Sequence, residues 1–349
     1  MPILPSIGTR LGAGWGRYLA KAPLAGHDFG DVLAEQVRFR IIRAGATSID
    51  DVRPDSRAAR TLWKHPETRQ VVQGVLDLAN SVSGSGGASP LRGFTLSTTE
   101  AGYVANRAVH HFRDGTPTRD AFEAGLAAAR SHVHETAAVR KGAWLHLDPA
   151  RSAGLLHMLR NPGTELAELS PHTRDSLGRG VKTLLHELNH VSSPRPHGAA
   201  RLDWLSEANA ETLARWPGQV RRAGETLGIP VPARVGRWFD DEGRPYQEEV
   251  DALRGLLRLA GIDTSRIGSF SRAERLLNGT PEDRLPAKLA KLIADRHTTN
   301  VADERALARR IERIIVKEIA PDGSNARARP VEALRAELEG RHVVRFRHD

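Results

Sequence analysis

The segment His-Glu-Leu-Asn-His at residues 186–190 is the part of the chain whose residue types and spacing could do chemistry. On a helix, residues four apart lie on the same face, so His186 and His190 can direct their imidazole rings at one metal ion. Glu187 is offset from that pair and can face a water molecule at the metal's open coordination position. Zinc lowers the pKa of such a water to about 7, and a neighbouring carboxylate can take its proton during attack on a carbonyl carbon. The segment therefore predicts metal-assisted hydrolysis, with Glu187 as general base.

A catalytic zinc ion needs a third protein ligand, with the fourth position left for water. The chain contains no cysteine, so this ligand must be a histidine, an aspartate or a glutamate. The downstream residues that offer such a side chain are Glu207, Glu211, His197 and Asp203.

The arrangement of these residues resembles the gluzincin branch of the zincin metallopeptidases. In that branch the third ligand is a glutamate on a downstream helix, often in a setting like Trp-Leu-x-Glu-x-x-Ala. The chain has DWLSEANAETLA at 203–214, which places Glu207 at that position. The resemblance implies a zinc cofactor, Glu207 as the third ligand, and Glu211 as a carboxylate that orients a ligating histidine. It covers roughly residues 141–216.

The metzincin branch of the same enzymes fits less well. It would require a glycine and a histidine where the chain has Ser193 and Pro196. His197 is one place away from that histidine, and Asp203 would serve in an aspartate-type variant. Both therefore stay open as alternatives to Glu207.

A peptidase of this kind also needs a group that stabilises the oxyanion formed during attack, commonly a tyrosine, a histidine or an arginine. Tyr246 opens an amphipathic segment that continues to residue 259, and it is our candidate. Arg244 and His197 are the alternatives.

Two predicted helices and one predicted strand must position these residues. The pattern predicts a helix over about 175–191, ended by the Ser-Ser-Pro at 192–194, and a second helix over about 203–216. Apolar and polar residues alternate in KGAWLHLDP at 141–149, which predicts a half-buried strand with His146 on its polar side. The resemblance implies that this strand is the sheet edge that pairs with an extended substrate.

The remaining pattern predicts a helix-rich α+β protein, in which a small mixed sheet lies over the helix that carries residues 186–190. We predict an accessory helical region over 1–80 and a flexible linker over 81–93, which contains SVSGSGGASP. A zincin-like metallopeptidase domain follows over 94–320, and a basic tail over 321–349.

Composition limits the functional classes. The chain has 349 residues, a hydrophobic share of 40% and no cysteine, and it has no apolar run of about 18 residues, so no membrane insertion is expected. The N-terminus lacks the pattern of a conventional secretory signal, which predicts action in a cytosol and is compatible with an effector or cargo protease delivered into another cell.

Two other functional classes stay open. The formal net charge is +9, but the arginines are spread among acids, so we do not expect nucleic acid as the main partner. The expected partner is a protein or peptide substrate. The rivals are a protein that keeps the zincin scaffold for interaction without turnover, and a basic nucleic-acid-binding protein.

Overall fold

The computed structural model describes residues 23–24, 27–83, 89–103, 105, 137–139, 144–192, 202–231, 246–265, 267–298, 300–320 and 329–345. The chain forms two compact units. The first unit comprises residues 1–82, 87–192 and 217–236, and the second comprises 83–86, 193–216 and 237–349.

A five-stranded mixed sheet is the centre of the first unit, with strand order β4-β3-β5-β7-β6. Only β5 and β7 run parallel to each other, and the other neighbours are antiparallel. The predicted helix-rich α+β class with a small mixed sheet is thus confirmed. The strands are β3 (Val37–Ile41), β4 (Val52–Pro54), β5 (Gly93–Leu96), β6 (Ala137–Val139) and β7 (Trp144–Leu147), and a separate pair comprises β1 (Pro23–Leu24) and β2 (His27–Asp28).

Strand β7 lies inside this sheet, which corrects the prediction of a half-buried edge strand. Its outer neighbour β6 pairs with it over residues 137–139. The side chains on its polar face are also buried, since Trp144 is 2% exposed and His146 is 0% exposed. The alternation of residue types predicts a strand, and the structure has one at Trp144–Leu147, but the alternation does not show that both faces of that strand are covered.

Polar side chains pair across three strands of the sheet: Arg38 on β3, Thr95 on β5 and His146 on β7. Arg38 is a buried cation. Arg38 pairs in register with Thr95 of β5, and its guanidinium lies 3.3 Å from the Asp55 carboxylate. Burial lowers the pKa of Arg38, and the charge of Asp55 opposes this shift. On the opposite face, the paired residues are the apolar Phe39, Phe94 and Leu145.

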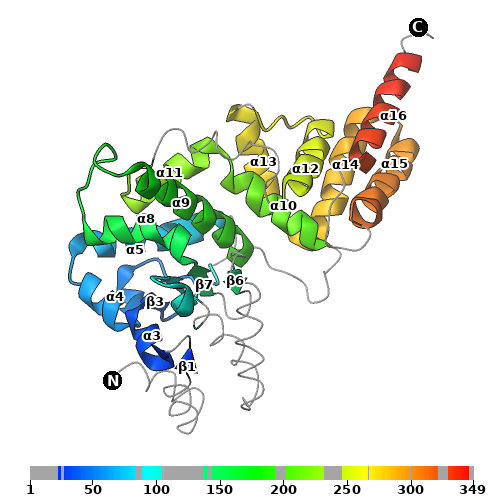
Figure 1. The fold of residues 1–349 in the computed structure, drawn as a ribbon. Coiled ribbons are helices and arrows are strands. Elements are labelled where there is room, and N and C mark those ends of the chain that lie inside the picture. The colour runs from blue at the N-terminus through cyan, green and yellow to red at the C-terminus, as the bar shows by residue number, and fades with distance from the viewer. Residues whose placement is uncertain are drawn as a thin grey trace. The chain divides into compact units, whose positions relative to one another are not determined.

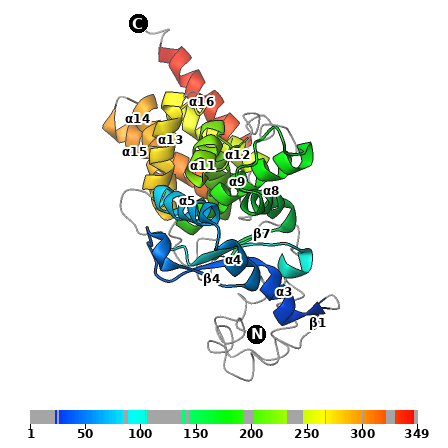
Figure 2. The ribbon, with the colours of Figure 1, turned by 90° about the vertical axis from the view of Figure 1, so that its left-hand side faces the viewer.

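Helices α5 (Pro66–Val82), α8 (Pro149–Arg160), α9 (Pro171–Ser192) and α11 (Pro217–Leu227) pack together on one side of the sheet (Figures 1 and 2). Helix α9 contacts α8, α5 and α11, and it also contacts β7 and β6. Helix α8 begins directly after β7. Asp148 caps it by accepting a hydrogen bond from the Arg151 amide at 2.8 Å, and Pro149 suits the first turn because proline needs no amide donor there. The short helices α3 (Phe29–Glu35) and α4 (Arg57–Leu62) contact each other, and α4 contacts β3 and β4.

The second unit is helical in the residues that the structure describes. Its helices are α10 (Asp203–Ala214), α12 (Gln247–Leu259), α13 (Ile267–Gly279), α14 (Leu285–His297), α15 (Val301–Arg313) and α16 (Arg329–Arg345), and α15 continues into a π-helical turn, η5 (Ile314–Glu318). One apolar core joins them, and it includes Trp204 and Leu205 of α10. Trp216 stacks on Phe270 with ring centroids 4.0 Å apart. In the described part of the chain, no helix has the length and hydropathy that a membrane span needs.

The units do not follow the boundaries predicted from the sequence. Strand β3, from the region predicted as accessory, is hydrogen-bonded to β5, which begins the predicted catalytic domain. The boundary between 1–80 and 94–320 therefore runs through one sheet. At the other end, α16 lies in the predicted tail, and its Val331, Leu334 and Leu338 are buried in the core of the second unit.

Candidate metal centre

Helix α9 carries the first two predicted ligands and holds them in a buried position. The helix begins at Pro171, earlier than predicted, after Ser170 accepts a hydrogen bond from the Thr173 amide at 3.1 Å. Its apolar side chains are buried in the first unit: Leu177, Val181, Leu184, Leu185 and Leu188. This packing fixes the rotation of the helix and therefore the direction in which the histidines point.

The two histidines lie beside each other at the carboxyl end of α9. His186 is 6% exposed and His190 is 7% exposed. Their Nε2 atoms are 3.0 Å apart, and the ring centroids are 4.6 Å apart with an angle of 78° between the planes. The four-residue spacing thus places both imidazoles on one face, as the sequence predicts.

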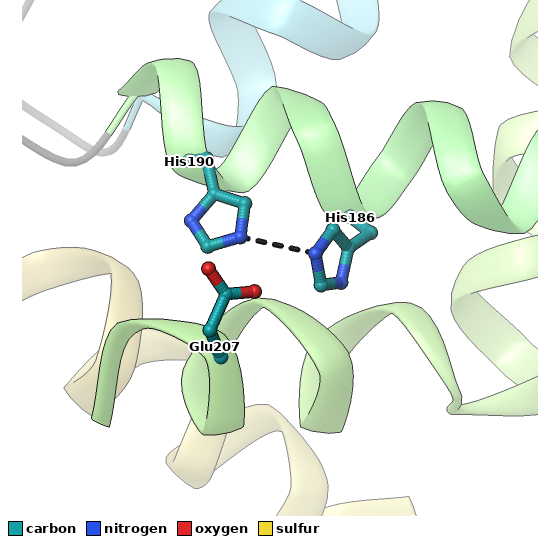
Figure 3. A group of neighbouring side chains, drawn as sticks. All are labelled: His186, His190 and Glu207. Carbon is teal, nitrogen blue, oxygen red and sulfur yellow. Dashed lines mark hydrogen bonds between the residues drawn. The ribbon is translucent and has the colours of Figure 1, made fainter. Parts of the chain in front are cut away.

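Glu207 completes a group of three possible ligands. It lies on α10 and is half-buried, while its neighbours Trp204, Leu205 and Ala208 are buried and anchor that helix. The ligand atoms of His186, His190 and Glu207 all lie within 4.8 Å of one another, and Figure 3 shows the three side chains pointing toward one another. Of the residues that the structure describes, this is the group that could hold a metal ion.

The donor set of this group suits zinc. Two imidazole nitrogens and one carboxylate oxygen form a common ligand set of catalytic zinc, at metal–ligand distances of about 2.0–2.2 Å. Two such ligands of a tetrahedral ion lie roughly 3.3 Å apart. The two histidine nitrogens are already near this separation at 3.0 Å.

The predicted base, Glu187, is 1% exposed and follows the first histidine on α9. A carboxylate in such a water-poor setting interacts more strongly with nearby charges than it would at the surface.

Glu211 lies one turn after Glu207 on α10 and is 4% exposed. Its Oε1 accepts a hydrogen bond from Arg215 Nε at 2.8 Å, and Arg215 Nη1 donates to Gln247 Oε1 at 2.6 Å. Sequence reasoning missed this buried ion pair. The signal that could have indicated it is an acid four residues before an arginine on the same helix.

Three of the other predicted site residues, Tyr246, Asp203 and Glu211, lie in the described part of the chain. Tyr246 precedes α12 with a φ of 64° and is 39% exposed. Asp203 is the first residue of α10, and His197 and Arg244 lie outside the described residues. Glu211, an alternative third ligand, is not part of the group of described residues that could hold a metal.

Comparison of the chain with models of protein families, with curated proteins and with solved structures finds no match.

Proposed function

We propose that the chain is a zinc metallopeptidase of the gluzincin type, with His186, His190 and Glu207 as metal ligands. The observation that carries the proposal is the proximity of the three ligand atoms, all within 4.8 Å of one another. Two of these residues come from α9 and the third from α10, in the order along the chain that the gluzincin resemblance implies.

In the proposed reaction, the metal and the glutamate that follows the first histidine share the work of hydrolysis. When bound, a zinc ion would lower the pKa of a water molecule and polarise the carbonyl of the scissile bond. The Glu187 carboxylate accepts the proton of the attacking water and then donates it to the leaving amine. Its burial, at 1% exposure, keeps bulk water away from this transfer. Tyr246 is our candidate for stabilising the oxyanion.

The experiment that tests the proposal is cleavage of a mixture of peptides by the purified protein, followed by mass spectrometry. We expect cleavage that stops when a chelator removes the metal and returns when zinc is added. Cleavage that a chelator does not affect would contradict the proposal. A stoichiometric metal without any cleavage would favour the rival, a zincin-like scaffold that binds partners without turnover.

A further inference from the structure

A cavity of about 380 Å³ lies in the first unit, at the opposite end of α9 from the histidine pair. Its lining includes Ser97, Ala153, Leu156, His157, Arg160 and His172. Helices rise 1.5 Å per residue, so His172 lies roughly 21 Å along α9 from His186. The cavity is therefore separate from the candidate metal centre.

Hydrogen bonds between three elements hold the walls of this cavity. Ser97, directly after β5, donates its amide hydrogen to Leu147 O at 3.1 Å and to Ser152 Oγ of α8 at 3.0 Å. Ser176 of α9 accepts a hydrogen bond from the Gly154 amide of α8 at 2.9 Å. The cavity thus adjoins the carboxyl ends of the two parallel strands β5 and β7, a place where α/β sheets commonly bind ligands.

The lining is rich in hydrogen-bond donors. Arg160, His157 and His172 project from two helices, and none of the described residues lining the cavity carries a carboxylate. The amino end of α9, a helix of 22 residues, adds the positive end of its dipole. Arginine remains charged at any physiological pH and matches the geometry of carboxylates and phosphates.

Ser97 is a buried polar residue beside the cavity. It is 0% exposed, it lines the cavity, and its Oγ has no hydrogen-bond partner among the described residues. A buried hydroxyl without a partner costs free energy, because its hydrogen bonds to water are lost on folding. A ligand oxygen in the cavity would supply that partner once the hydroxyl turns toward it, because the Oγ itself has no accessible surface.

We propose that this cavity binds a small organic anion, whose phosphate or carboxylate group contacts Arg160, His157 and His172. Ser97 bonds the same molecule, and Leu156 and Ala153 contact its apolar part. The volume agrees with a ligand larger than a bare oxyanion, since small-molecule pockets usually span about 300–1,000 Å³. The proposal does not depend on the metallopeptidase function.

The test is isothermal titration of the full chain with phenyl phosphate, benzoate and inorganic phosphate at fixed ionic strength. We expect saturable binding at one site, about tenfold weaker in Arg160→Ala and in His172→Ala, because each change removes a hydrogen bond to an anion. Tighter binding of phenyl phosphate than of benzoate would assign a phosphate monoester, and the reverse order would assign a carboxylate.

Three variants make the test decisive. Arg179→Ala removes the same charge from an exposed position on α9 and should bind like the wild type. His190→Ala should also bind like the wild type, whereas loss of binding in that variant would place the anion at the metal centre. Ser97→Ala should weaken binding, and unchanged affinity would remove Ser97 from the site. Absence of saturable binding, or equal weakening by Arg160→Ala and Arg179→Ala, would overturn the proposal.

Discussion

The two ends of α9 carry polar groups in opposite settings. At the carboxyl end, His186, Glu187 and His190 are 6%, 1% and 7% exposed. At the amino end, His172 is exposed and lies at the mouth of a cavity shared with α8. Buried polar groups interact strongly with nearby charges, whereas exposed polar groups are screened by solvent and salt.

This difference separates two kinds of expected effect. Changes at the carboxyl end of α9 should alter chemistry and stability strongly, because buried groups have no water to replace a lost partner. Changes at the exposed amino end should alter ligand affinity with little cost to the fold. The following predictions test how burial changes the size of an effect, on α9 and elsewhere, beginning with the largest effect.

Glu187→Gln should lower peptide cleavage by about 10²–10⁴-fold, because the amide cannot take up the proton of the attacking water. Metal content and affinity for phenyl phosphate should stay at the wild-type level. Initial cleavage rates measure the first effect, and titration measures the second. Glu225→Gln on α11, which changes an exposed glutamate, is the matched control. Comparable rates for Glu187→Gln and the wild type would contradict the assigned role.

Arg215→Ala should lower the free energy of unfolding by about 3–5 kcal/mol, because it leaves the buried Glu211 carboxylate without its arginine. The side chains of this pair are 1% and 5% exposed. Urea unfolding followed by circular dichroism measures the change. A loss below about 1 kcal/mol would show that water or another group compensates for Arg215.

Gly154→Ala should cost about 1–3 kcal/mol, because a methyl group there would overlap the backbone of Leu177 where α8 meets α9. The same change should weaken binding in the cavity more than binding of the metal, since the cavity needs both helices. Gly279→Ala is the control, as a Cβ at that position meets no atom within 4 Å. Equal costs for the two variants would show that α8 and α9 can separate without strain.

Arg179→Ala should cost less than about 0.5 kcal/mol, the smallest of these effects. Its ion pair with Asp175 has the same 2.8 Å distance and the same four-residue spacing as the pair of Arg215 with Glu211. Its side chains, however, are 62% and 27% exposed. If both arginine variants lost the same stability, burial would not be what distinguishes the two pairs.

The sequence was sufficient for features that a few neighbouring residues determine. The spacing of His186 and His190 places both rings on one helical face, and the apolar Leu184, Leu185 and Leu188 show which side of that helix is buried. Glu207 is predicted only by the resemblance, because no rule of spacing relates residues on two different helices.

Features that depend on distant pairing were not predictable. Strand β7 alternates polar and apolar residues, yet His146 is buried, and the alternation does not show which residues cover it. The sequence also does not predict the cavity, because Ser97, Arg160 and His172 lie in separate segments and form no motif. The predicted boundary at residues 81–93 followed a stretch of small residues, whereas the hydrogen bonds of the sheet join β3 to β5 across it.

Metal content, measured by mass spectrometry on the wild type and on Glu207→Ala, tests the central claim most directly. Glu248→Ala, which removes an exposed glutamate from the first turn of α12, is the control. We predict about one zinc ion per chain in the wild type and in the control, and loss of most of it in Glu207→Ala. No stoichiometric metal in the wild type after zinc is added, or full retention in Glu207→Ala, would contradict the account.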